Sequence, residues 1–350
     1  MRCMFCNCYS LVSLDLSKFN TISTTDIAYM FEECRNLTSI DLSKFDTSEV
    51  LYMDRIFKGC SLLIHLNLSN FITSKVEWMA YMFEGCSSLV ELDLSNFDTS
   101  LVKYFFGMFS GCTNLTSLSL KNFNTSSAEN MCWMFNRCLS LISLDITNFV
   151  TKNVKNMRIM FGECASLKSL DLSKFDTSLV TDMGWMFYRC ISLVSLDIGN
   201  FVTSNVTDMS VMFNECNSLI TLDLSHFNTS QVTDMSLMFQ KCFSLKSLNL
   251  QHFVTSKVND MSFMFDECSS LTSLDISNFN TSSVLNMKWM FHKCLSLKIL
   301  DVTGFITINV ENTRIMFGEC ISLTSRDLAN FDTSSVSDMG WMFYDCTNLN

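Results

Sequence analysis

A cysteine that returns every 26 residues constrains this chain more than any other feature. A phenylalanine and a threonine keep the same interval, from Phe19 to Phe331 and from Thr21 to Thr333. A repeat of this length cannot bury its own apolar side, whereas stacked neighbours can. The interval therefore predicts a solenoid with a continuous core. The cysteines of the series are Cys8, Cys34, Cys60, Cys86, Cys112, Cys138, Cys164, Cys190, Cys216, Cys242, Cys268, Cys294, Cys320 and Cys346.

Two shorter periods lie inside each repeat. Leu14–Ser17 alternate apolar and polar residues, which predicts a short half-buried strand. Between residues 50 and 60, apolar side chains recur at a spacing of three to four residues, which predicts one face of a short helix. Thr47 or Ser48 stands where a side chain can cap the first free amides of that helix. Each repeat is thus expected to form a strand, a turn and a helix.

The repeat runs through the whole sequence without a linker. We therefore expect residues 1–350 to form one elongated repeat domain of about 13.5 repeats. Met1–Cys8 match the end of a repeat, with no signal peptide before them, and Cys346–Asn350 match the beginning of one. Solenoids need polar end caps, and neither end matches a cap. We interpret the sequence as a segment that is truncated within a repeat at both ends.

Charge and composition exclude several classes of function. Asp and Glu outnumber Lys and Arg by 35 to 24, which gives a net charge of −11 at pH 7. Because nucleic acids are densely negative, this charge argues against a nucleic-acid partner. The sequence has no apolar run of about 18 residues, so we predict no membrane insertion. It also has no glycine-rich phosphate loop and no recurring nucleophile–base pair, so we predict neither a cofactor nor a catalytic residue.

Cysteine usage invites a disulfide or metal interpretation, and we favour neither. Stacked repeats bring the thiols of the series near one another, but parallel side chains point the wrong way for a disulfide. We predict free thiols that pack in one inner row as small apolar groups. Cys3, Cys6 and Cys8 have spacings that suggest zinc, yet a closed zinc site needs four ligands and no further pair follows. We interpret them as part of an incomplete helical end and predict no metal.

The most regular polar position lies between the two strand leucines. Alternation predicts that these side chains line the outer face of the strands. Carboxylates in such a row, about 5 Å apart, repel one another. Hydrogen bonds to neighbouring hydroxyls and water, bound cations, or a basic ligand could each offset that repulsion, and we favour the first. The row is also our candidate binding surface, and its aspartates are Asp15, Asp41, Asp93, Asp145, Asp171, Asp197, Asp223, Asp275, Asp301 and Asp327.

Other chemically distinctive residues are scattered. We interpret the histidines as surface residues, because a metal site needs further ligands. The tryptophans either form an exposed stripe for a partner or, as we favour, cover the seams between stacked helices. Arg326 replaces a strand leucine, so we expect Ser322–Asp327 to pack less well than the equivalent residues of other repeats. The histidines are His65, His226, His252 and His292, and the tryptophans are Trp78, Trp133, Trp185, Trp289 and Trp341.

These motifs carry a family resemblance. The run L-x-x-L-D-L-S-x-F-x-T-S-x-V-x-x-M-x-x-M-F-x-x-C resembles the 26-residue repeat of bacterial surface proteins grouped with the BspA-like leucine-rich-repeat proteins. The resemblance covers the whole chain. It implies an α/β, leucine-rich-repeat-type solenoid with one short parallel strand and one short helix per repeat. It also implies a place at the cell surface or outside the cell, and a protein partner such as a host or matrix protein.

The repeat and the resemblance together predict a role in recognition. Many similar sites along one face can add weak contacts into firm binding. We therefore predict a non-enzymatic scaffold that serves adhesion or protein binding through a face of the solenoid. The alternative is a structural spacer that projects another domain of a longer protein.

Overall fold

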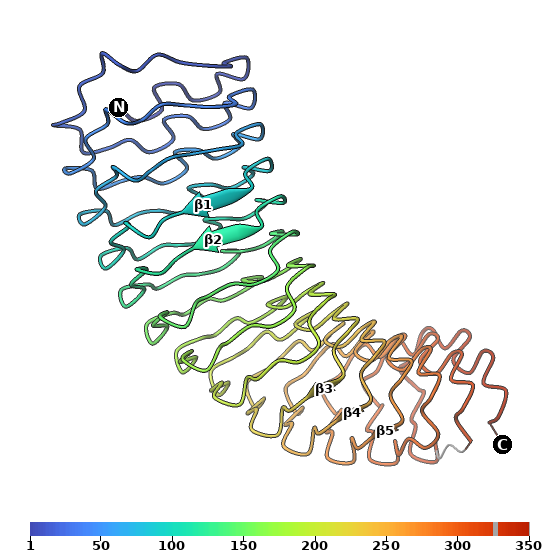
Figure 1. Ribbon diagram of the computed structural model, residues 1–350. Coiled ribbons are helices and arrows are strands. Elements are labelled where there is room, and N and C mark those ends of the chain that lie inside the picture. The colour runs from blue at the N-terminus through green and yellow to red at the C-terminus, as the bar shows by residue number, and fades with distance from the viewer. Residues whose placement is uncertain (325–327, 350) are drawn as a thin grey trace. The chain divides into compact units, whose positions relative to one another are not determined.

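A computed structural model describes residues 1–324 and 328–349 of the chain. The chain divides into two compact units, Met1–Asp176 and Thr177–Asn350. Within each unit the backbone winds into coils that lie one above another, and each repeat forms one coil (Figure 1). The described part of the chain contains no helix that could span a membrane.

Short parallel strands occupy the predicted strand segment. In the first unit, β1 (Glu91–Asp93) pairs with β2 (Ser117–Ser119). In the second unit, β3 (Thr221–Leu222), β4 (Ser247–Leu248) and β5 (Ser273–Leu274) pair in that order, side by side in Figure 1. Every pair joins residues 26 apart, because the register of the sheet is the register of the repeat. The predicted parallel strand is thereby confirmed, and it is short.

The predicted helix is wrong, because a series of turns takes its place and the described residues form no helix. The amide of Ile56 donates to the Met53 carbonyl at 3.4 Å, and that of Cys60 donates to Phe57 at 3.1 Å. Arg55 and Gly59, the third residues of these turns, have φ values of +57° and +73°, which makes the turns type II. We call residues 53–60 and their equivalents the turn segment.

Hydrogen bonding explains why turns replace the helix. Along the turn segment, alternate amides bond to their own turn, and the others bond to the next coil. Arg55 donates to Ala80 at 2.9 Å, and Phe57 donates to Met82 at 3.0 Å. A helix of two turns would leave most of its terminal amides and carbonyls without partners. Successive turns also return to the core every three or four residues, which is why the apolar spacing resembled a helix.

The predicted helix cap has a different role. The Thr47 hydroxyl is buried, donates to the Ile72 carbonyl at 2.9 Å and accepts the Ile72 amide at 2.7 Å. The same two-way bridge links Thr229 to Val254 in the second unit. The threonine that recurs every 26 residues therefore joins consecutive coils through the backbone of the residue before the next threonine.

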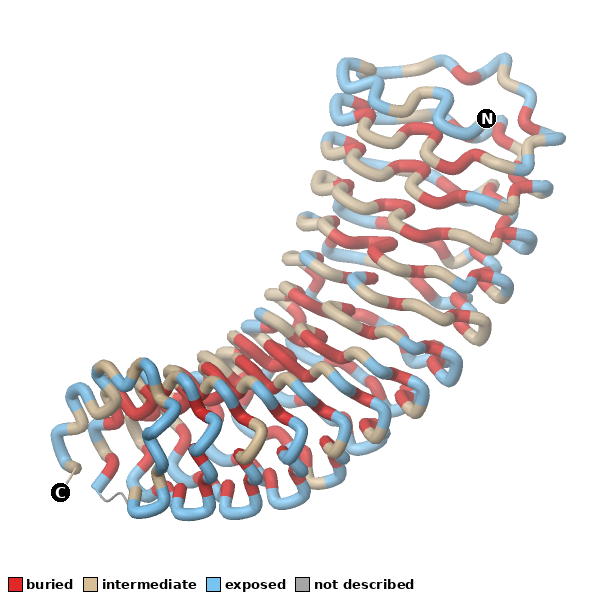
Figure 2. Tube along the Cα trace, turned by 180° about the vertical axis from the view of Figure 1, so that it is seen from behind, coloured by how far each residue is buried: buried red, intermediate tan, exposed pale blue. Residues whose placement is uncertain are grey.

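Buried residues recur at the same places on successive coils (Figure 2), and two of the inner rows are made of phenylalanine and of cysteine. Phenylalanine rings, buried except at Phe5 and Phe343, stack from coil to coil at centroid distances of 5.6–5.9 Å from Phe5 to Phe161, and at 5.2–5.7 Å from Phe187 to Phe343. The 17 cysteines form no disulfide, and those of the series from Cys34 to Cys320 are buried. The predicted inner row of free thiols is confirmed.

The thiols also make hydrogen bonds. Cys60 Sγ donates to the Phe31 carbonyl at 3.2 Å, and that carbonyl already accepts the Cys34 amide at 3.1 Å. Burial raises the pKa of Cys112 to about 12, so that its thiol stays protonated at neutral pH. The recurring cysteine thus combines the volume of a small apolar group with a donor for a carbonyl of the previous coil.

Candidate functional site

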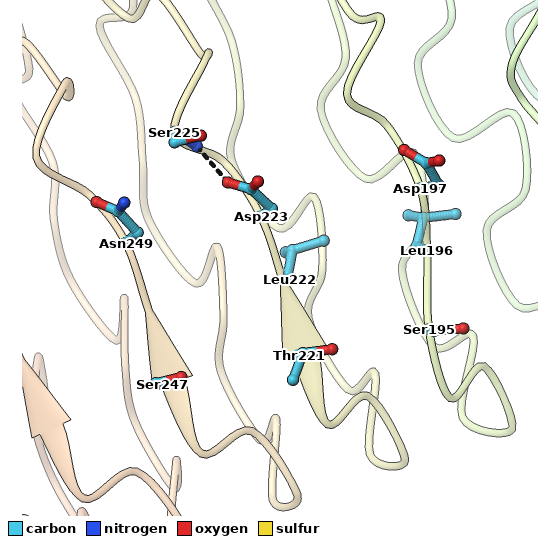
Figure 3. A pocket seen from close by; sticks show the side chains of 9 residues that line it. All are labelled: Ser195, Leu196, Asp197, Thr221, Leu222, Asp223, Ser225, Ser247 and Asn249. Carbon is cyan, nitrogen blue, oxygen red and sulfur yellow. Dashed lines mark hydrogen bonds between the residues drawn. The ribbon is translucent and has the colours of Figure 1, made fainter.

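The predicted acidic side chains lie on the exposed face of the strand segments, which we call the strand face. The aspartates from Asp15 to Asp301 are exposed, while the flanking strand residues alternate into the core. Asp327, and with it the expected loose packing around Arg326, lies outside the described residues. We call the described aspartates of this series the acidic row. Figure 3 shows Asp197, Asp223 and Asn249 at equivalent places on three successive coils.

Each carboxylate of the row closes a small turn. Asp223 Oδ1 accepts the Ser225 amide at 2.9 Å, and Asp41 Oδ1 accepts the Ser43 amide at the same distance (Figure 3). This Asx turn ends the strand, because it offers the backbone a partner other than the next strand. Asn67 makes the same bond to the Ser69 amide at 3.0 Å. The side chains of the acidic row therefore have a structural role in these turns, and the same side chains form the candidate binding surface.

At Asp223 and Asp145 the turns favour the charged form of the carboxyl. At Asp223 the amide of Ser225, and then its hydroxyl, lowers the pKa of the carboxyl. At Asp145 the hydroxyl of Thr147 donates at 2.7 Å and is the main cause of the lowered pKa, while the charge of Asp171 opposes it. Bonds to neighbouring hydroxyls therefore offset the repulsion along the row, as the favoured interpretation predicted.

The strand face is hollowed in both units. In the second unit, a shallow hollow of about 500 Å³ has Asp197, Asp223 and Asn249 along one side. Hydroxyls line the other side, and Leu196 and Leu222 lie between the two. The hydroxyl residues are Ser195, Thr221 and Ser247. In the first unit a hollow of about 730 Å³ places Asp93 beside Asn67, Ser119 and Glu91. These hollows offer charge, hydrogen bonding and an apolar strip side by side.

A second acidic row escaped the sequence analysis. Asp182, Asp208, Asp234 and Asp260 stand at equivalent places on successive coils of the second unit and form parallel bridges. Burial raises the pKa of Asp234, and the charges of Asp208 and Asp260 raise it further. The row was hidden because these residues fell within the predicted helix. Their spacing of 26 residues was the signal that could have revealed it.

A buried polar chain was also missed. Asn214 Nδ2 donates to Gln240 Oε1 at 2.7 Å, and Gln240 Nε2 donates to Asp266 Oδ2 at 2.7 Å. Asp266 Oδ1 then lies 2.7 Å from His292 Nδ1, and His292 Nε2 lies 3.4 Å from Glu319 Oε1. Such a chain stabilises a fold only when each member has its partner. Asn214, Gln240, Asp266 and His292 share one position of the repeat, and Glu319 stands at the next position.

His292 corrects the surface interpretation, whereas His65, His226 and His252 are exposed as predicted. His292 is 3% exposed and is wedged between Asp266 and the ring of Trp289, whose centroid is 4.4 Å away. His226 Nε2 lies 2.8 Å from the carbonyl oxygen of Ile198 on the previous coil, where Asn70 and its equivalents bind other turns. Both rings therefore support the stack. The signal was available, because each histidine replaces a polar residue of its own column.

The tryptophans lie on the outer side of the turn segment. Trp78 and Trp289 contact rings of adjacent coils, Tyr104 at 4.4 Å and Phe263 at 5.7 Å. They cover seams as expected, although the seams join turns rather than helices. Trp133 and Trp341 are more exposed, at 39% and 60%.

The comparisons with known proteins agree with this architecture. A family model described as "Mycoplasma protein of unknown function, DUF285" matches residues 1–89, 64–170, 160–270 and 242–350. The chain belongs to this family. The matches of the DUF285 model overlap along the chain, as expected of a repeat. No curated protein sequence matches the chain.

Solved structures similar to this DUF285 protein are leucine-rich-repeat proteins. A leucine-rich repeat protein from Bacteroides ovatus is 20% identical, with 92% of this chain and 73% of that chain covered and a TM-score of 0.51. A leucine rich cell surface protein from Faecalibacterium prausnitzii is 18% identical, with 77% and 74% covered and a TM-score of 0.43. The Bacteroides structure shows the leucine-rich-repeat solenoid fold, and the resemblance to the BspA-like repeat is confirmed.

Proposed function

We propose that this DUF285 protein is a non-enzymatic recognition scaffold that binds a protein partner on its strand face. The single observation that carries the proposal is the hollow of the second unit, where carboxyl groups, hydroxyls and an apolar strip lie side by side. Such a surface can hold an extended segment whose basic and amide groups meet the two polar edges. Its leucines would contact the apolar part of the same segment.

The repetition of the strand face extends the proposal to adhesion. A ligand that contacts several coils gains from each of them, because binding at one coil raises the effective concentration at the next. Individual contacts can then be weak, as exposed ion pairs are. A display at the cell surface or outside the cell, with a host or matrix protein as partner, is the setting in which we propose that this avidity operates.

Asparagine substitutions test the strand face without breaking its turns. Asn67 already makes the Asx bond, so the Asp197→Asn, Asp223→Asn double variant removes two charges and retains both turns. A matched control is the Asp98→Asn, Asp332→Asn variant. These two carboxylates close the same kind of turn, to Ser100 at 3.0 Å and to Ser334 at 2.9 Å, at a different position of the repeat.

Binding is measured by surface plasmon resonance on immobilised fibronectin, laminin and collagen and on a lysine-rich peptide. At roughly 0.5 kcal/mol per exposed ion pair, the first variant should raise Kd about fivefold on any surface that the wild type binds. The control variant should bind as the wild type does. If both variants bind more weakly by the same factor, binding depends on net charge alone. If neither variant binds more weakly, the acidic row takes no part in recognition. Either result overturns the proposal.

A further inference from the structure

The thiols at the beginning of the first unit have no role in the core or in the proposed binding surface. Cys3 and Cys6 form a C-x-x-C sequence, and the Cys6 amide donates to the Cys3 carbonyl at 3.2 Å. That bond closes a turn, which holds the Cα atoms of its first and fourth residues within about 7 Å, inside the range of a disulfide. Cys3 is exposed and Cys6 is half-buried, whereas most cysteines of the chain are buried.

The coil around these cysteines repeats the turn segment of the others. Cys3 and Phe5 donate their amides to the Ala28 and Met30 carbonyls of the next coil, and Cys3 has a φ of +56°. Cys3 therefore corresponds to Trp185 of a later repeat, and Cys6 corresponds to Tyr188. The geometry of those later pairs shows how the two thiols lie.

Side chains at these two positions meet on the outer side of each coil. The rings of Trp185 and Tyr188 are 4.9 Å apart. A Cβ atom built on Gly318 would lie 2.6 Å from Ile315 Cγ2, so the γ atom of the first position faces the β carbon of the second. A γ sulfur on one residue close to the Cβ of the other is the arrangement that a disulfide requires.

We propose that Cys3 and Cys6 form a thiol–disulfide exchange site that takes low-molecular-weight disulfides such as oxidised glutathione. The thiolate of Cys3 attacks one sulfur of oxidised glutathione, which forms a mixed disulfide and releases one glutathione thiolate. The thiolate of Cys6 then attacks the Cys3 sulfur, which forms the Cys3–Cys6 disulfide and releases the second glutathione. Two protein thiols are oxidised, and one glutathione disulfide is reduced to two thiols.

The surroundings of the two thiols assign these roles. Cys3 is the more exposed and meets the incoming disulfide first. Burial and the neighbouring carboxylate of Glu32, whose Oε2 lies 3.5 Å from Cys6 Sγ, raise the pKa of Cys6 to about 11. Cys6 therefore attacks slowly, since only the thiolate reacts. Cys8 is also exposed and stands at the repeat position of the inner row of thiols, whereas Cys3 and Cys6 are the first and fourth residues of one turn, so that Cys3 is the better partner for Cys6.

Mass spectrometry of the whole chain treated with oxidised glutathione tests the site. Trypsin releases residues 3–18 as one peptide that holds all three cysteines. After free thiols are alkylated, we expect this peptide to have lost two hydrogens and to carry one alkyl group, on Cys8. The Cys8→Ser variant should close in the same way. The Cys6→Ser variant should stop at glutathione bound to Cys3.

Three results would overturn the proposal. They are a wild-type peptide that carries only glutathione, a Cys3→Ser variant that closes as well as the wild type, and a chain unfolded in guanidinium chloride that closes as fast as the folded one. Glu32→Gln gives a kinetic readout, because it removes a charge that raises the pKa of Cys6. We expect this variant to convert the mixed disulfide faster at neutral pH, and an unchanged or slower rate would contradict the role of Cys6.

Discussion

The buried threonine that joins consecutive coils makes a prediction that separates hydrogen bonding from packing. Thr229 is 0% exposed, and its hydroxyl donates to the Val254 carbonyl at 2.9 Å and accepts the Val254 amide at 2.8 Å. Thr229→Val keeps the shape of the side chain and removes the hydroxyl. The amide and the carbonyl of Val254 then lose the partner that they share.

The expected loss of stability in Thr229→Val depends on the amide and the carbonyl of Val254, which lose their hydrogen-bond partner. An orphaned buried donor or acceptor costs about 1–3 kcal/mol. Two such groups would cost about 2–6 kcal/mol, but the side chain of Val254 is 44% exposed, so that water reaches its backbone in part. We therefore expect a loss near the lower end, about 2 kcal/mol. Thr229→Ser is the matched control, since it keeps the hydroxyl and loses one methyl group, about 1 kcal/mol.

Stacked coils do not unfold in one step, so that a local measurement is the sharper assay. Native-state hydrogen exchange of the Val254 amide should accelerate about thirtyfold in the valine variant, the equivalent of about 2 kcal/mol. Urea unfolding should show the valine variant to be less stable than the serine variant. A valine variant as stable as the serine variant, with unchanged exchange at Val254, would refute the reasoning.

Two further substitutions test polar groups that the fold holds at a cost. Thr313 replaces a methionine of most other repeats, is 2% exposed, and has no hydrogen-bond partner for its hydroxyl among the described residues. Thr313→Val should therefore raise the free energy of unfolding in urea by about 1 kcal/mol. A loss of stability would show that the hydroxyl has a partner. Asp234 has a raised pKa in the folded protein, so its carboxyl favours folding below the ordinary value of 3.8 and loses that contribution as the pH rises through its folded pKa. Asp234→Asn should therefore stabilise the protein at pH 7 by more than at pH 3 in thermal unfolding, and an equal effect at both pH values would exclude the charges of Asp208 and Asp260 as the cause.

The sequence was enough to predict which residues of neighbouring coils lie side by side, but not the secondary structure between the strands. The spacing of 26 residues was enough to place Leu92 opposite Leu118 and to file the cysteines in one inner row, because stacking requires equivalent residues to meet. The helix was wrong, since turns and helices leave the same apolar spacing. Glycines at 59, 85 and 111, all with positive φ, were the sign of left-handed turn positions that the apolar pattern concealed.

The candidate site divides in the same way. Alternation along the strand was sufficient to place Asp223 and its equivalents on the outer face. The Asx turns could not be assigned, because hydroxyl and carboxylate partners two residues apart also occur in strands that continue. The polar chain that ends at His292 was missed because each member looked like an isolated polar residue. That residues 1–350 form a single domain remains a prediction.

The bonds between coils restrict how such a gene can change in length. The threonine hydroxyl and the amides of the turn segment form hydrogen bonds to residues 25 positions later in the chain. The cysteine thiol forms one to a residue 29 positions earlier. One codon inserted within a bonded segment moves the residues after it out of register with both neighbouring coils, whereas a whole repeat keeps every partner. Proteins built on this plan therefore lengthen or shorten most easily by whole turns of the spiral, which favours unequal recombination over insertions in those segments as the source of variants.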